Sequence, residues 1–195
     1  MIDAEVRAAD TILRRWSIRY VVVGGQAVAQ RAATTTHDVD VMVATIDFKN
    51  TVARLRRDPD LAFDWEDDQI ARFRILPAGG VPLDVINPSH FSGKRPGAEF
   101  FTYLTEQGSE EIEGISYAAP EVVWYTRLLT KRWRSYAEKI VTNVIDGVAA
   151  GRLKKVEEIA RRFGTEETVR ERIAHVREEL ARPEIDSLVR RPESL

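Results

Sequence analysis

The segment YVVVGGQAVAQRAATTTHDVDV, residues 20–41, holds the two strands and the turn from which the rest of the chain can be placed. Its first part, Tyr20 to Val23, is a β-branched run closed by Gly24-Gly25, which predicts a buried strand entering a tight turn. Its last part alternates aspartate with valine, and this period of two predicts a second strand with two distinct faces. A short helix is expected between the strands, from Gln26 to Ala33.

The second expected strand carries two carboxylates. Asp38 and Asp40 lie two residues apart, so both side chains should lie on one face of the strand. Two like charges side by side raise the free energy unless a cation or strong hydrogen-bond donors neutralise them. Mg²⁺ (or Mn²⁺) would resolve this conflict, because hard cations prefer oxygen ligands and nucleotide phosphates can complete their coordination. A third carboxylate, Asp84, lies in another apolar segment, so the three aspartates are predicted to be the metal ligands and catalytic residues of a phosphoryl-transfer site.

The Gly24-Gly25 turn lies at a strand-to-helix junction, and twelve residues, 26–37, separate it from Asp38. Glycine allows backbone N–H groups to approach a phosphate closely, and the N-terminus of the following helix adds a favourable dipole. Gly24 and Gly25 are therefore candidate nucleotide-binding residues. Gln26 is a third, because its amide could donate to a phosphate, although an exposed first-turn residue fits the sequence equally well.

Periodicity predicts the remaining elements. Helices are expected over 3–16 and 46–57, and strands over 61–65, 70–76 and 81–86, with Gly79-Gly80 as the hairpin turn between the last two. A loop is expected over 88–96, with Lys94 and Arg95 in it, and 99–118 predicts one short element followed by a hairpin around Gly114. Further helices are expected over 120–133, 136–149, 153–163 and 166–181. This order favours an α/β or α+β module, residues 1–119, packed against a helical part, residues 120–195.

Composition narrows the class of protein. The chain has 195 residues, 44% of them hydrophobic and 31% charged, which is typical of a soluble globular protein. It has no cysteine, which excludes disulfides and thiolate metal sites. The acidic N-terminus does not resemble a signal peptide, and no apolar run approaches the length of a membrane span. We therefore expect a cytoplasmic protein without a membrane partner.

Charge is unevenly distributed along the chain. Residues 1–119 carry 13 Lys/Arg against 18 Asp/Glu, whereas residues 120–195 carry 16 against 13. Arg127, Lys131 and Arg134 have a spacing that would place them on one face of the helix expected over 120–133. A basic face beside an acidic catalytic half would suit a nucleotide or nucleic-acid enzyme, and a solvated helix surface explains the charges equally well.

The combination Val23-Gly24-Gly25, Asp38-Val39-Asp40-Val41 and Leu83-Asp84-Val85 resembles the DNA polymerase β-like nucleotidyltransferase superfamily. The segment Ala118-Ala119-Pro120-Glu121 is similar to the turn that opens the helical half of its AbiEii-like toxin–antitoxin branch. This resemblance implies an α+β fold, with a nucleotidyltransferase-type mixed β-sheet and flanking helices followed by a C-terminal helical bundle. It also implies transfer of a nucleoside monophosphate from a nucleoside triphosphate to an acceptor hydroxyl.

The same resemblance suggests partners and further site residues. A tRNA or a protein is the favoured acceptor, and a cognate antitoxin is an implied partner. Arg127 and Lys139 match lysines that follow the "PE" turn in that branch and are candidate nucleotide-binding residues. Thr34 stands where the branch often has arginine, so substrate contacts differ at that position.

Two alternatives to this reading remain. A small-molecule nucleotidyltransferase of the aminoglycoside-modifying kind would have a deep acidic acceptor pocket, whereas an RNA acceptor predicts a continuous basic surface around 127–139. A catalytically silent module that binds a partner and has kept the fold is the second alternative.

Overall fold

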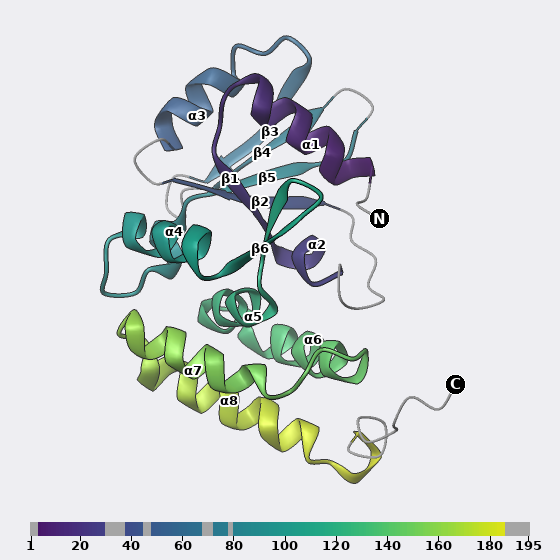
Figure 1. Cartoon of the computed structure of the whole chain (residues 1–195), viewed down its shortest axis with the longest axis vertical. Helices are drawn as coiled ribbons and strands as arrows, with labels where there is room; N and C mark the ends of the chain where they lie inside the picture. Colours follow the sequence, from purple (N-terminus) through teal and green to yellow (C-terminus); the bar gives the residue numbers. More distant parts are fainter. Residues whose placement is uncertain (1–3, 30–37, 45–47, 68–71, 78–79, 186–195) are drawn as a thin grey trace.

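The computed structural model describes residues 4–29, 38–44, 48–67, 72–77 and 80–185, which form one mixed sheet covered by helices. The sheet has seven strands in the order β3-β4-β5-β2-β1-β7-β6 among these described residues. Figure 1 shows α1 (Ala4–Arg15) and α3 (Phe48–Leu55) on one side of it and the C-terminal helices on the other.

The other elements follow in chain order. The strands are β1 (Tyr20–Val23), β2 (Val39–Val43), β3 (Leu61–Asp67), β4 (Arg72–Pro77), β5 (Leu83–Ile86), β6 (Ser109–Ile112) and β7 (Ile115–Ala118). The helices are α2 (Gly24–Ala29), the 3₁₀ helix η2 (Pro88–Phe91), α4 (Gly97–Glu106), α5 (Pro120–Leu129), α6 (Trp133–Ile145), α7 (Arg152–Arg162) and α8 (Glu166–Leu180).

Strand β1 lies near the middle of the sheet, between β2 and β7. It pairs antiparallel with β2, placing Val22 opposite Val41, and parallel with β7. Val21, Val22 and Val23 are all buried, because an interior strand covered on both sides requires apolar residues on both faces. Strand β2 pairs parallel with β5 on its other side, and this register places Asp40 opposite Asp84.

Helix α5 joins the sheet layer to the C-terminal helices. It contacts α2 on the sheet side and α6, α7 and α8 on the other. Val122, Val123, Trp124 and Tyr125 are consecutive and all buried, as expected of a helix surrounded by protein. The N-terminal turn is held by Glu121, which pairs with Arg152 at 2.5 Å and with Lys155 at 3.4 Å on α7.

Most expected elements are confirmed, and three are corrected. The helix expected over 136–149 is α6, which begins at Trp133 and ends at Ile145. The loop expected over 88–96 begins with the 3₁₀ helix η2, whose first turn is capped by the Asn87 side chain accepting from the Ser89 N–H at 2.9 Å. The helix expected over 120–133 ends at Leu129. The expected residues 30–33, 46–47 and 70–71, and Gly79 of the hairpin turn, lie outside the described residues.

The early end of α5 has one local cause and one long-range cause. Thr130 is extended, with ψ 162°, and its hydroxyl donates to the Arg127 carbonyl at 2.9 Å. The guanidinium group of Arg172 on α8 donates to the carbonyls of Leu128 and Thr130, which removes the need for a further helical turn. Arg127, Lys131 and Arg134 therefore do not share one helix face, and that part of the expectation for a basic surface is wrong.

The buried hydrophobic residues form a single cluster that extends from α1 to α8. The division at residue 119, where β7 ends and α5 begins, stays a prediction. Within the described part of the chain, none of the helices has the length and apolar character needed to cross a bilayer.

Candidate active site

The three predicted aspartates lie together at one end of the central strands. Asp38 immediately precedes β2, Asp40 lies within it, and Asp84 is paired with Asp40 across the β2–β5 ladder. Their side chains differ in exposure: 40% for Asp38, 19% for Asp40 and 0% for Asp84. The parallel register thus places a partly exposed carboxylate, Asp38, and a mostly buried one, Asp40, beside a fully buried third carboxylate.

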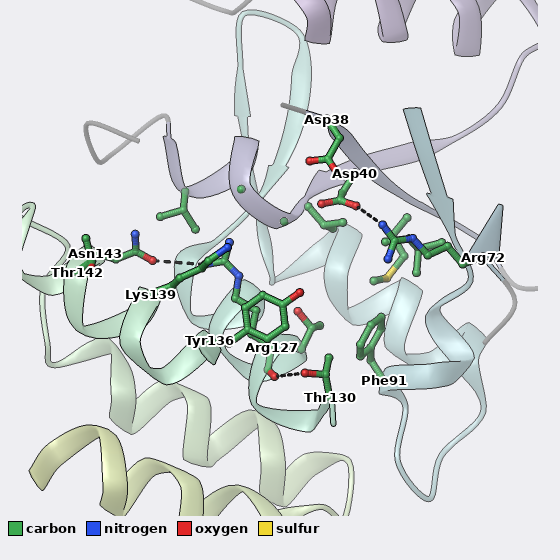
Figure 2. A pocket seen from close by; sticks show the side chains of 17 residues that line it. Asp38, Asp40, Arg72, Phe91, Arg127, Thr130, Tyr136, Lys139, Thr142 and Asn143 are labelled. Carbon is green, nitrogen blue, oxygen red and sulfur yellow. Dashed lines mark hydrogen bonds and ion pairs between the residues drawn. The ribbon is translucent and has the colours of Figure 1, made fainter. Parts of the chain in front are cut away.

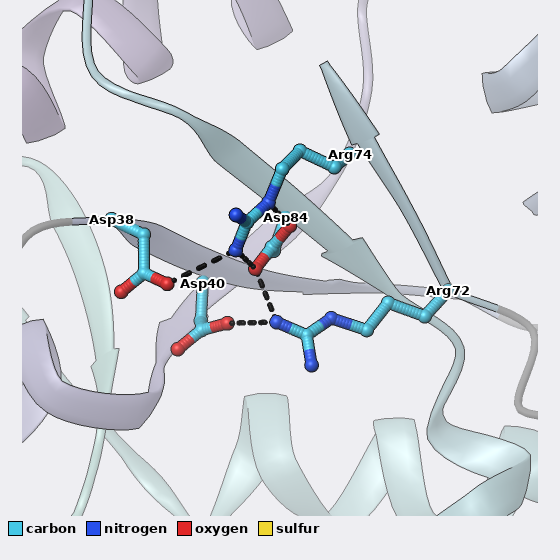
Figure 3. A network of polar contacts seen from close by, with 5 residues as sticks. All are labelled: Asp38, Asp40, Arg72, Arg74 and Asp84. Atoms are coloured by element: carbon cyan, nitrogen blue, oxygen red, sulfur yellow. Dashed lines mark hydrogen bonds and ion pairs between the residues drawn. The ribbon is translucent and has the colours of Figure 1, made fainter. Parts of the chain in front are cut away.

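Two arginines that the sequence analysis did not select hold this cluster (Figure 3). Arg74 is directly opposite Asp84 in the β4–β5 ladder, and both of its contacts with the Asp84 carboxylate, from Nε and from one terminal nitrogen, are 2.7 Å long. The same terminal nitrogen reaches Asp38 at 3.2 Å. Arg72 bridges Asp84 and Asp40, the latter at 3.4 Å. The buried charge of Asp84 is therefore compensated by two guanidinium groups.

The alternation of Arg72 and Arg74 with buried Phe73 and Ile75 was the available signal. Two cations on one face of the strand that forms a hairpin with the Asp84 strand could neutralise its charge, but the register that places Arg74 opposite Asp84 could not be derived from the sequence. In the part of the chain that the structure describes, no group of three or more His, Cys, Asp or Glu side chains is arranged to hold a metal ion. The metal-binding and catalytic roles of Asp38, Asp40 and Asp84 stay predictions.

Of the three aspartates, Asp40 has a carboxyl whose pKa is clearly raised. Burial raises the pKa of its carboxyl to about 7; Arg72 opposes this shift, whereas the negative charges of Asp38 and Asp84 add to it. The two arginines therefore leave the carboxylates short of positive charge. A hard divalent cation at the Asp38/Asp40 pair, which borders the cavity, would fit this deficit and the all-oxygen donor set.

The position of Asp40 leaves no room for a side chain at residue 24, so glycine is required there. Its φ is +65°, in the left-handed region that favours glycine, and the chain turns there from β1 into α2. A Cβ at this position would overlap with Oδ2 of Asp40 and lie 2.9 Å from its Cγ. From the sequence, this turn is expected to let a phosphate approach the backbone; in the structure, Gly24 also makes room for a carboxylate.

A cavity of about 550 Å³ opens between the sheet and helices α5 and α6 (Figure 2). It is large enough for a nucleotide-sized ligand. Its lining residues are Val23, Gly24, Gly25, Val28, Asp38, Asp40, Met42, Arg72, Ile86, Phe91, Thr126, Arg127, Thr130, Tyr136, Lys139, Thr142 and Asn143. Of the predicted site residues, Gly24, Gly25, Asp38, Asp40, Arg127 and Lys139 line it.

The wall formed by α5 and α6 carries positive charge around one aromatic ring. The Arg127 guanidinium and the Lys139 ammonium each lie 5.6 Å from the centre of the Tyr136 ring. Arg127 also donates to Oδ1 of Asn143 at 3.5 Å. Burial lowers the pKa of Arg127, while Tyr136 and Asp40 act in the opposite direction. The cavity therefore has carboxylates on the sheet side and two cations on the helix side, as Figure 2 shows.

The structure does not bring every predicted residue to this cavity. Asp84 lies behind the arginines and does not line it. Gln26 is 2% exposed and is not among the lining residues either; its Oε1 accepts no hydrogen bond from the described part of the chain. Thr34 lies outside the described residues.

Comparisons with known proteins address the fold. No protein-family model matches the chain, and no curated protein matches its sequence. A solved structure of an antigenic nucleotidyltransferase-like protein from Paracoccidioides brasiliensis is similar with a TM-score of 0.53 and 18% identity, over 95% of this chain and 89% of that chain. The antibiotic-resistance factor ANT(2'')-Ia gives a TM-score of 0.46 and 14% identity, over 93% of this chain and 94% of that one. The first of these similarities, together with the mixed sheet, shows that the chain has the nucleotidyltransferase fold.

Proposed function

We propose that this protein is a nucleotidyltransferase that moves a nucleoside monophosphate from a nucleoside triphosphate to an acceptor hydroxyl, releasing pyrophosphate. One observation carries the proposal: the 550 Å³ cavity has the Asp38/Asp40 pair on one wall and Arg127 and Lys139 on the opposite wall. A triphosphate between these walls would meet a cation held by the carboxylates on one side and two side-chain cations on the other. The AbiEii-like branch remains part of the proposal, with an antitoxin as its cognate partner.

Asp38 and Asp40 would hold Mg²⁺ (or Mn²⁺), which when bound supplies Lewis-acid stabilisation of the charge that develops on the phosphates. Arg127 and Lys139 would bind phosphate oxygens and orient the triphosphate for in-line displacement. Gly24 and Gly25 line the same cavity and would let the ligand approach the backbone. Asp84, paired with Arg74, would keep Asp38 and Asp40 in position rather than contact the ligand.

The charges in the cavity also bear on the acceptor. Asp38 and Asp40 are the only carboxylates among its described lining residues, against three cations: Arg72, Arg127 and Lys139. An aminoglycoside is a polycation and would need further acidic side chains there. The absence of such side chains from this described lining favours an acceptor that is neutral or anionic, in keeping with a tRNA end or a protein side chain.

A catalytically silent binding module is the second candidate. It is favoured by the pairing of all three aspartates with arginines, which neutralises part of the charge that would attract a metal ion. Such a module would bind a partner without turning over a nucleoside triphosphate.

Labelling separates these functions. The protein would be incubated with Mg²⁺ and each α-³²P-labelled nucleoside triphosphate in the presence of total RNA or cell lysate, and labelled products separated by size. The proposal is supported if label is transferred to a macromolecule and this transfer is lost in Asp40→Asn. The matched control, Asp64→Asn at an exposed position on β3, should keep the transfer. Nucleotide binding without labelled product, across RNA, lysate and an aminoglycoside panel, would favour the silent module.

A further inference from the structure

A second hollow, of about 350 Å³, lies between the loop after η2 and the C-terminal end of α7. Four of its lining residues are cations, Lys94, Arg95, Arg161 and Arg162, and Glu99 is the only carboxylate among the described lining residues. This concentration of positive charge is distinct from the cavity that holds Asp38 and Asp40.

Hydrogen bonds to the backbone carbonyls at the end of α7 fix the two sides of the hollow against each other. The Lys94 N–H donates to the Phe163 carbonyl at 3.1 Å, and Arg95 Nε donates to the Arg162 carbonyl at 3.1 Å. Gly93 has φ +59°, and a Cβ there would overlap with the same Phe163 carbonyl. The loop therefore lies directly on the helix end, and the backbone positions of Lys94 and Arg161 are fixed relative to each other before any ligand binds.

Capping of α7 explains only part of this charge. Arg95 pairs with Glu99 at 3.3 Å in addition to its helix-end contact. Arg162 donates to Gln107 at 3.0 Å and stacks on the Tyr103 ring at 4.8 Å.

Lys94 and Arg161 differ from Arg95 and Arg162 because their cationic groups have no side-chain partner among the described residues. In the described part of the chain, neither the Lys94 ammonium nor the Arg161 guanidinium makes a hydrogen bond or ion pair with another side chain. The terminal carbonyls of α7 are already met by the backbone N–H groups of Lys94, Gly164 and Thr165. These two cations are thus available to an anionic ligand.

The hollow is close to the candidate active site along the chain. Phe91 lines the first cavity and Lys94 lines the second. Three residues can separate two Cα atoms by no more than about 11 Å. This bound reaches the edge of the first cavity at Phe91, and at about 3.4 Å per nucleotide roughly three stacked nucleotides cover the step from the hollow to that edge.

We propose that this hollow binds the phosphate backbone of a single-stranded nucleic acid whose hydroxyl end reaches the candidate active site. Lys94 and Arg161 contact phosphates, while Arg95 and Arg162 supply positive potential and shape. The proposal rests on the proposed nucleotidyltransferase function and names the class of its acceptor. The hollow also takes the place of the basic helix face predicted from Arg127, Lys131 and Arg134 as the binding surface for an RNA acceptor. That face does not form, because α5 ends at Leu129.

The test is the affinity for a fluorescent twelve-nucleotide single strand, as RNA and as DNA, measured by anisotropy over a salt series. The variant is Lys94→Gln/Arg161→Gln, and the matched control is Lys154→Gln/Arg170→Gln, which removes one exposed lysine and one exposed arginine elsewhere on α7 and α8. We expect the variant to bind at least about tenfold more weakly, with a salt slope flatter by about 1.4, because two phosphate contacts are lost. The control should bind as the wild type does.

Nucleoside triphosphate affinity is measured in parallel on all three proteins, and thermal melting verifies that each is folded. Unchanged triphosphate binding with weakened strand binding supports the hollow, and a preference for RNA or DNA identifies the acceptor. Three outcomes would refute nucleic-acid binding in the hollow without affecting the proposed nucleotidyl transfer. They are equal losses of strand affinity in the variant and the control, no strand binding by the wild type, and transfer of label to protein alone. Failure of the wild type to bind any triphosphate would instead defeat the proposed function.

Discussion

The Asp40 carboxylate occupies the space in which a side chain at Gly24 would have to lie. These two residues come from different elements, β2 and α2, and Asp40 is opposite Val23, the residue before Gly24, in the β1–β2 ladder. The Gly-Gly turn and the aspartate pair are therefore one structural unit, and a change to either should disturb the other.

Gly24→Ala should weaken Mg²⁺-dependent nucleotide binding strongly, because the added methyl group displaces Asp40. It should also destabilise the fold by about 1–2 kcal/mol, the cost of a left-handed conformation for alanine. Gly114→Ala is the matched control: Gly114 has φ +79°, and a Cβ there meets nothing within 4 Å. Calorimetric titration of both variants should show loss of binding only in Gly24→Ala. Wild-type affinity in Gly24→Ala would mean that the overlap is relieved without moving the carboxylate.

Asp40→Asn should stabilise the metal-free protein at pH 8 and change little at pH 4. The pKa of Asp40 is about 7 in the folded state against an ordinary value of 3.8, so the folded protein holds a proton between these pH values that the unfolded chain has released. Stability contributed by this site therefore falls as pH rises through that window, by up to about 4 kcal/mol. Urea unfolding of the wild type and Asp40→Asn at several pH values measures the difference. A difference independent of pH would contradict the raised pKa.

Arg74→Met should lower the free energy of unfolding by about 3 kcal/mol, because it removes the bidentate partner of a fully buried carboxylate. The double variant Arg74→Met/Asp84→Leu should recover most of that loss, since the fully buried carboxylate is then absent and Arg72 keeps Asp40 as its partner. Arg57→Met, at an exposed position after α3, should have little effect. Equal losses in Arg74→Met and the double variant would show that packing around the arginine, not its charge, stabilises this region.

Lys139→Gln should weaken nucleoside triphosphate binding about tenfold, the effect of losing one charge-assisted contact with a phosphate. Lys131→Gln is the matched control, because Lys131 is exposed and does not line the cavity. Titration with inorganic tripolyphosphate should show the same contrast if the contact is to phosphate and not to the base. Similar affinities of both variants would remove Lys139 from the triphosphate site.

Local sequence determined the elements that build the site. The β-branched run before Gly24 predicted an interior strand, which is confirmed, and the alternation of Asp38 and Asp40 with valine predicted that both carboxylates lie on one face. These properties depend on backbone periodicity and on the conformational freedom of glycine, which act over a few residues.

The limits of sequence reasoning are visible within the same site. Arg127 and Lys139 were selected by resemblance, but the helix expected to continue past Arg127 ends at Leu129, because Arg172, more than forty residues later, binds its last carbonyls. Local helical periodicity carries no information about that contact.

Tertiary structure alone decided which charges meet. The sequence shows Arg72, Arg74 and Asp84 as separate residues, and only the β4–β5 register places Arg74 opposite Asp84. It shows Lys94 and Arg161 nearly seventy positions apart, and only the packing of a loop on the end of α7 brings them to one hollow. The physical reason is that strand register and helix packing are set by burial of the whole core, whereas a sequence pattern reports only the face on which each side chain lies.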